Sequence, residues 1–237
     1  MPYSYYYGID PTYILVLIGA VICMIASARV KSTYNKYSRY RSASGMTGAE
    51  AAQRILNTAG IYDVTIQHVS GNLTDHYNPS NKTLNLSDSV YGSTSVAAVG
   101  VAAHECGHAI QHAKGYAPLS FRSALVPVAN IGSSLAWPLI IIGALFNNRM
   151  SMTLIEAGII LFSLAVLFQL VTLPVEINAS RRAMVMLREQ AILGDQELNM
   201  TRKVLTAAAL TYVAGAASAI LQLLRIILLF GGRDDRD

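Results

Sequence analysis

The stretch TYILVLIGAVICMIASA, residues 12–28, decides the fold class, because it is apolar, uncharged and followed at once by basic residues. About 20 apolar residues are enough to cross the hydrocarbon core of a bilayer. Asp10 can cap a helix that starts here, and Pro11 suits its first turn. The basic residues that follow are Arg29, Lys31, Lys36, Arg39 and Arg41. Positive charge marks the cytoplasmic side of a span, so we expect an integral membrane protein with its amino terminus outside.

Three further apolar segments, at about 124–146, 153–173 and 204–230, are long enough to be spans. The hydrophobic content of 53% and the mean hydropathy of +0.39 are also high for a soluble protein. The last segment contains Arg225, so it is either a span with Arg225 near one end or a helix packed against the others. Basic residues follow the third segment, at Arg181, Arg182, Arg188, Arg202 and Lys203. Successive crossings put them on the same side as the first basic cluster, as expected for a bacterial plasma membrane protein.

The net charge of +4 is explained by this orientation and does not require a nucleic-acid partner. The basic residues are scattered along juxtamembrane segments and form no nucleic-acid-binding motif. The lipid bilayer is therefore the expected partner, together with any substrate. The two cysteines, Cys23 and Cys106, lie in an apolar span and in a central motif and do not suggest a disulfide framework. The sequence does not indicate an oligomeric state.

Residues 46–115 are less apolar and read as a small α+β unit. MTGAEAAQRILNTAGI (46–61) predicts a helix with a capping box of Thr47 and Glu50. The alternation in YDVTIQHVSG (62–71) predicts a strand, and a turn at residues 78–81 precedes a second strand at Lys82–Ser87. A second long helix is expected, with Ser93 or Ser95 as its cap and Gly115 as its stop.

The motif HECGH (residues 104–108) lies within this second helix. His104 and His108 are four residues apart, which places both imidazoles on one helical face, where they can bind one Zn²⁺. Glu105 can then act as general base toward a water molecule that zinc makes more acidic. The alternative is a surface helix with coincidental histidines, but unpaired His and Glu side chains in such apolar surroundings would be unfavourable. The motif therefore predicts amide hydrolysis.

A catalytic zinc site needs a third protein ligand. His112 lies on the same helix, about 12 Å along the axis from His104, too far to share an ion, so we expect it to line the pocket or contact substrate. Glu176, in LPVEINASRRAM (173–184), follows the third span on the cytoplasmic side. It is either the third ligand or a solvated glutamate that pairs with Arg181 or Arg182. The ligand role is favoured because the charge pattern places it on the same side of the membrane as the histidines.

The sequence AAHECGHAIQH, followed about seventy residues later by LPVEINASRRA, resembles the YugP-type membrane zinc metallopeptidases, distant relatives of the HtpX-like and CAAX-prenyl endopeptidases. The resemblance covers nearly the whole chain, including DHYNPSNKTLNLS (75–87). It implies His104, His108 and Glu176 as zinc ligands and Glu105 as the catalytic residue. It also implies that Ser180, where relatives often carry aspartate, supports a ligating histidine through a hydrogen bond.

The resemblance further implies a place for the substrate. In similar enzymes a strand just before the zinc helix forms an edge on which an extended peptide lies, and Lys82–Ser87 occupies that position. Its residues Leu84, Asn85 and Leu86 are the candidate substrate contacts, although an ordinary packed hairpin fits the sequence equally well. The candidates for stabilising the oxyanion are Arg181, Arg182 and His112.

We therefore predict a mainly α, polytopic membrane protein with a small α+β zincin-like domain at the cytoplasmic face. The expected parts are an anchor with its basic segment (1–45), the metallopeptidase segment (46–115), and a helical membrane region (116–237) that includes a third-ligand helix at 174–193. The expected activity is a gluzincin-like zinc endopeptidase, because a His, His, Glu ligand set suits Zn²⁺. Its expected substrates are membrane proteins or peptides. The alternatives are an intramembrane, site-2-like metalloprotease and a non-catalytic zinc-binding scaffold or chaperone subunit.

Overall fold

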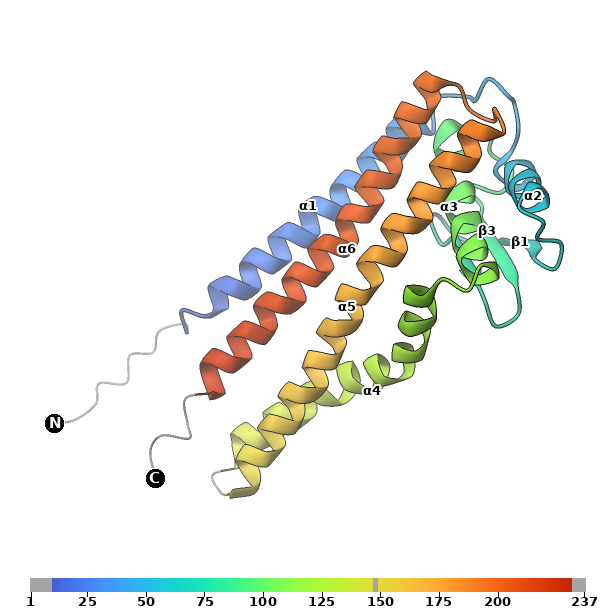
Figure 1. Cartoon of the computed structure of the whole chain (residues 1–237). Coiled ribbons are helices and arrows are strands. Elements are labelled where there is room, and N and C mark those ends of the chain that lie inside the picture. Colours follow the sequence, from blue (N-terminus) through green and yellow to red (C-terminus); the bar gives the residue numbers. More distant parts are fainter. Residues whose placement is uncertain (1–9, 147–148, 232–237) are drawn as a thin grey trace. The chain divides into compact units, whose positions relative to one another are not determined.

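The computed structural model describes residues 10–146 and 149–231, and these are mainly helical (Figure 1). The long helices are α1 (Tyr13–Tyr37), α4 (Ala117–Leu145), α5 (Arg149–Glu189) and α6 (Asp195–Phe230). The shorter elements are the helices α2 (Gly48–Thr58) and α3 (Val96–Ala113) and the strands β1 (Thr65–Val69), β2 (His76–Asn78) and β3 (Thr83–Ser87).

The four long helices are each long and apolar enough to cross a membrane. The four predicted spans coincide with α1, α4, α5 and α6, so the predicted class of a helical membrane protein with a small sheet is confirmed. The helix start predicted at Asp10 is also found, since its carboxylate accepts hydrogen bonds from the amide and hydroxyl of Thr12 at 2.9 and 2.8 Å. The segment 174–193, expected as a helix of its own, is for the most part the continuation of α5 through Pro174.

The chain folds into two compact units. The described residues of the first are 10–25, 125–146, 149–169 and 214–231. Within it α1 and α6 are in contact, because the Cys23 thiol donates to the carbonyl of Ala214 and the guanidinium of Arg225 lies 3.7 Å from Asp10 Oδ2. Arg225 is therefore paired with a carboxylate instead of facing lipid alone.

The second unit consists of residues 26–124 and 170–213 and contains every residue of the predicted site. Its core is built by α2, α3, the sheet and the adjoining parts of α5 and α6. Buried side chains such as Ile55, Leu84, Val99, Leu187 and Leu198 meet in this core. The division of the chain at residues 45 and 115 stays a prediction.

The capping box at the start of α2 is present as predicted. The Thr47 hydroxyl accepts from the Glu50 amide at 3.2 Å, and the Glu50 carboxylate accepts from the Thr47 amide at 2.8 Å. At the other end of α2, Gly60 has a φ of +72°, which only glycine adopts readily. Helix α2 therefore begins and ends close to the predicted residues and packs on α3.

The sheet has the order β1-β3-β2, with β1 parallel and β2 antiparallel to β3. The prediction that the strand at Lys82–Ser87 offers a free edge is wrong, because β3 is the central strand and is paired on both sides. The turn at residues 78–81 closes a β2–β3 hairpin. Just before the start of β2, the Asp75 carboxylate accepts from the amide of Ser87 at the end of β3. Leu84, Asn85 and Leu86 are buried and are not available to pair with a substrate.

Helix α3 begins at Ser95, whose hydroxyl accepts from the Ala98 amide, and Gly115 follows its end with a φ of +59°. Most of its residues are buried. The buried residues include three with polar side chains, Glu105, His108 and Gln111. Because buried polar groups need partners, these three side chains indicate where the chemistry of the unit lies.

Candidate active site

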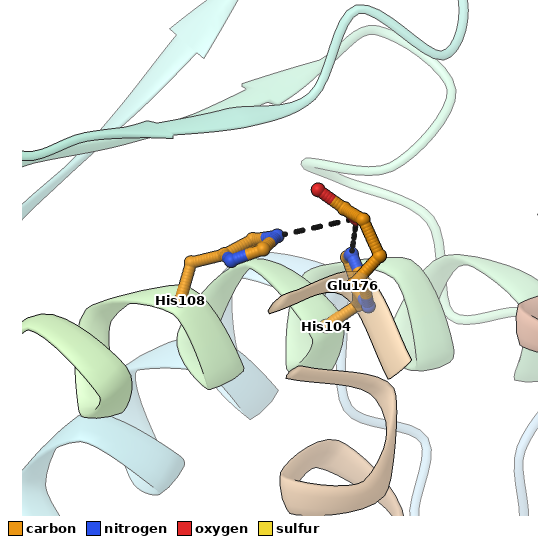
Figure 2. Close-up of side chains that lie close together, drawn as sticks. All are labelled: His104, His108 and Glu176. Atoms are coloured by element: carbon orange, nitrogen blue, oxygen red, sulfur yellow. Dashed lines mark hydrogen bonds and ion pairs between the residues drawn. The ribbon is translucent and has the colours of Figure 1, made fainter. Parts of the chain in front are cut away.

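His104 and His108 on α3 and Glu176 on α5 bring their donor atoms together (Figure 2). The Oε2 atom of Glu176 lies 3.3 Å from His104 Nε2 and 3.5 Å from His108 Nε2, and the donor atoms of all three residues lie within 4.8 Å of one another. Two ligands about 2.1 Å from a tetrahedral ion are separated by about 3.4 Å. The three side chains therefore fit one zinc ion.

Both histidines are oriented by hydrogen bonds through their other ring nitrogen. His104 Nδ1 lies 3.1 Å from the Ser180 hydroxyl, and His108 Nδ1 lies 3.0 Å from Gln111 Oε1. The Gln111 amide group donates from Nε2 to the Val175 carbonyl at 2.8 Å, so its oxygen faces His108 as an acceptor. Nδ1 of His108 must then carry the proton, which leaves the Nε2 lone pair free for a metal.

Glu105 lies next to these donors and is 7% exposed. Its Oε2 atom accepts a hydrogen bond from the backbone amide of Tyr77 at 2.9 Å. Because Tyr77 belongs to β2, this contact connects the edge of the sheet to the motif helix. It holds the carboxylate in one orientation.

A cavity of about 200 Å³ opens beside His104, Glu105 and Glu176. Most of its other lining is apolar and comes from α1, α3, α6 and the loop between β1 and β2. These lining residues are Val30, Tyr34, Leu73, Val101, Val204, Leu205, Ala208, Ala209 and Tyr212. The cavity therefore combines the candidate catalytic groups with an apolar wall, which is typical of a site that binds an organic ligand.

The structure places the remaining predicted residues away from the three donors. His112 is exposed, and its Nδ1 atom pairs with the Tyr77 hydroxyl at 2.8 Å. Arg182 donates from Nε to Asn178 Oδ1 at 2.7 Å and lies over the Tyr116 ring, while Arg181 is exposed. Neither arginine lines the cavity.

Several residues around the site were not anticipated from the sequence. Arg122 on α4 places Nη1 3.9 Å from Glu176 Oε1, and its Nε is buried without a hydrogen-bond partner among the described residues. Tyr212 on α6 lines the cavity and also interacts with Glu176. The contact of Gln111 with His108 could have been predicted, since Gln111 follows His108 by three residues on the same helical face. The other two come from distant elements, and nothing near the motif indicates them.

The charge state of His108 is set by its carboxylate neighbours. Burial alone lowers the pKa of His108, but the hydrogen bond to Glu176 and the charges of Glu105 and Glu176 outweigh it and raise that pKa above its ordinary value. A proton and a metal ion compete for the same Nε2 atom. Metal binding is therefore expected to weaken as the pH falls.

Gly107 allows α3 to approach α5 closely at the site. A Cβ atom added at Gly107 would lie 2.5 Å from the Ala179 carbonyl oxygen and 3.0 Å from its carbon. These are backbone atoms, so a larger residue would have to push the helices apart. The absence of a side chain at this position thus keeps Glu176 within reach of both histidines.

We expect Gly107→Ala to destabilise the protein by about 2 kcal/mol and to weaken zinc binding, even though alanine favours a helix by about 1 kcal/mol over glycine. The measurements are thermal unfolding and zinc content of the purified full-length protein. Gly215→Ala is the control at another helical glycine, since the added Cβ would meet only Gln169 Oε1, at an ordinary contact distance of 3.7 Å. Equal stability and zinc content in both variants would contradict the role of close packing at Gly107.

Comparisons with known proteins find matches that cover most of the chain. Residues 12–231 match the model of a family described as "putative neutral zinc metallopeptidase". The chain is 47% identical over 211 residues to the "Putative membrane protease YugP" of Bacillus subtilis (strain 168), which covers 89% of this chain and 92% of that protein. No solved structure matches the chain. Because the family match spans almost all of the sequence, the chain belongs to this family of neutral zinc metallopeptidases, whose metal is zinc.

Proposed function

We propose that this protein is a gluzincin-like zinc endopeptidase that hydrolyses peptide bonds of membrane proteins or peptides at the cytoplasmic face of a bacterial plasma membrane. The observation that carries the proposal is the convergence of three donor atoms beside a buried glutamate at the wall of a cavity. The orientation rests on the basic residues that follow α1 and α5.

His104, His108 and Glu176 would hold the zinc ion, with Ser180 and Gln111 orienting the two imidazoles. Bound zinc supplies a Lewis acid that polarises the scissile carbonyl and lowers the pKa of a water molecule to about 7. Glu105 takes a proton from the attacking water and gives it to the leaving amine. Three protein ligands leave a coordination position for the reaction, whereas a structural zinc site normally has four.

The edge of β2 is the proposed place for the substrate main chain. The Tyr77 amide points away from β3 and toward Glu105, so this edge of the sheet faces the catalytic residues. An extended peptide that pairs with β2 would bring a carbonyl group close to Glu105 with little demand on sequence. This assigns to β2 the role that the sequence suggested for β3.

The apolar wall of the cavity supports a preference for large apolar residues next to the cleaved bond. Val101, Leu205 and Ala208 lie on this wall, and burying an apolar side chain there removes it from water. Substrates taken from membrane segments carry such side chains. Polar residues at the same position would lose their hydrogen bonds to water.

Tyr212 and Arg122 are the proposed groups that stabilise the negative charge of the transition state. The Tyr212 hydroxyl can donate a hydrogen bond from the cavity wall, and the Arg122 guanidinium is a fixed positive charge beside Glu176. They take the place of Arg181 and Arg182, because Tyr212 lines the cavity and Arg122 pairs with Glu176, whereas Arg181 and Arg182 do neither.

The two alternatives are less well supported. An intramembrane protease would carry the motif on a membrane-spanning helix, whereas α3 packs on α2 and on the sheet. A non-catalytic scaffold would not need Glu105 in contact with the edge of the sheet beside three metal donors.

A chelation experiment tests the proposed activity. We expect the purified full-length protein in detergent to cleave an internally quenched peptide with leucine and phenylalanine around the scissile bond. A chelator should lower the rate by at least about 100-fold, and stoichiometric Zn²⁺, but not Mg²⁺, should restore it. A matched peptide with aspartate at these positions serves as the control. Cleavage that persists after the zinc has been removed would contradict the proposal.

A further inference from the structure

A second concave site lies between α1 and α6 in the unit of residues 26–124 and 170–213. It is a groove of about 330 Å³. Its lining residues are Arg29, Ser32, Thr33, Lys36, Tyr37, Arg202, Lys203, Thr206 and Ala207. We call it the basic groove, since four of these nine residues are cationic and none is acidic.

The four cations have no carboxylate partner within the described ranges, 10–146 and 149–231. Arg29, Lys36, Arg202 and Lys203 are exposed and form no ion pair there, whereas Arg188 and Arg225 do. Like charges around one concave surface repel one another and produce a positive potential that an anion would relieve. The groove is therefore suited to a negatively charged ligand.

Hydroxyl groups complete the lining. Ser32, Thr33 and Thr206 add hydrogen-bond donors between the cations, and a guanidinium group binds phosphate oxygens in pairs. A phosphate group accepts several such bonds at once. The chemistry of the groove therefore fits a phosphate better than a carboxylate.

The groove lies where both helices change from polar to apolar sequence. On α1 the uncharged segment 12–28 ends directly before Arg29, and on α6 the uncharged segment 204–224 begins directly after Lys203. Phospholipid headgroups lie at this boundary, at the edge of the hydrocarbon core. Juxtamembrane Lys and Arg residues attract anionic lipids, each by about fivefold in affinity.

We propose that the basic groove binds the phosphate headgroup of an anionic phospholipid, whose acyl chains follow the apolar surface beside α1 and α6. The inference depends on the membrane helices and not on the proposed peptidase activity.

The same helix pair also forms part of the catalytic cavity. Val30 and Tyr34 of α1 and Val204 and Leu205 of α6 line that cavity, and the residues next to them in sequence line the groove. A headgroup that contacts both helices would hold α1 against α6 behind the cavity wall. Lipid binding should therefore stabilise this unit as well as occupy its surface.

Native mass spectrometry of the full-length protein with phosphatidylglycerol or phosphatidylcholine tests the proposal. The groove variant Arg202→Gln/Lys203→Gln should bind phosphatidylglycerol about 25-fold more weakly than the wild-type protein. Phosphatidylcholine should bind weakly to both proteins. Phosphatidylglycerol should also raise the unfolding temperature of the wild-type protein more than that of the variant.

The control Lys31→Gln/Arg41→Gln removes the same charge from exposed juxtamembrane positions outside the groove. In detergent there is no charged bilayer surface to attract them, so cations that do not line the groove contribute little and this variant should bind like the wild-type protein. The charge-preserving swap Arg202→Lys/Lys203→Arg should restore most of the binding. Equal loss in the groove and control variants would overturn the site, since only general charge would then matter. If inorganic phosphate displaced the lipid at equal concentration, the groove would be a soluble phosphate site and the lipid assignment would be wrong.

Discussion

The Glu105→Gln variant is expected to bind zinc like the wild-type protein and to hydrolyse peptides about a thousandfold more slowly. Glutamine has the same shape as glutamate, and its amide oxygen can still accept the hydrogen bond from Tyr77. It cannot take a proton from water at neutral pH. His104, His108 and Glu176 are unchanged, so the donor set for zinc remains complete.

The measurement pairs the zinc content of the purified variant with initial rates on the quenched peptide. Glu189→Gln is the matched control, because Glu189 is exposed at the end of α5 and touches none of the three donors. An unchanged rate in the Glu105 variant would favour the scaffold alternative. Loss of zinc together with activity would instead give Glu105 a structural role.

The features that are local in sequence could be predicted from it. The four apolar helices follow from the length and composition of continuous segments, and the capping box at Thr47 follows from two residues three positions apart. The helical spacing of His104 and His108 is local in the same sense. For each of these features, all the residues that determine it lie within one short segment of sequence.

The order of the strands could not be predicted in this way. A short alternating segment such as Thr83–Ser87 has the same pattern at the centre or at the edge of a sheet. Its position depends on the parallel pairing with β1 and on the hairpin with β2, both of which are tertiary contacts. The assignment of the substrate edge to Leu84, Asn85 and Leu86 therefore failed.

The arginines proposed for the oxyanion could have been excluded by helical geometry. Ser180 follows Glu176 by four residues and shares its face, but Arg181 is five residues on and is rotated by about 140° from it. Arg182 is rotated by about 120° in the other sense. By contrast, Tyr212 and Arg122 come from α6 and α4, and only the folded chain brings them to Glu176.

The Glu176→Ala variant is expected to lose zinc affinity by at least about 100-fold and to show only background hydrolysis. Replacing residues that merely orient metal ligands costs about 10- to 100-fold, so removal of a ligand should cost more. The two histidines lie on one helix, and alanine leaves them without the carboxylate that lies 3.3 and 3.5 Å away. Zinc affinity measured by competition with a chelator, together with peptidase rates, tests this expectation.

Glu189→Ala is the control on the same helix, and Glu176→Asp keeps the charge while shortening the reach of the carboxylate. The aspartate variant should bind zinc with intermediate affinity, because a carboxylate is still present but lies farther from both imidazoles. If Glu176 served only as an ion-pair partner of Arg122, the alanine variant would keep its zinc and lose only stability. Retention of wild-type zinc affinity by Glu176→Ala would thus contradict the three-ligand site, whereas a graded loss from Asp to Ala would identify the carboxylate as the third ligand.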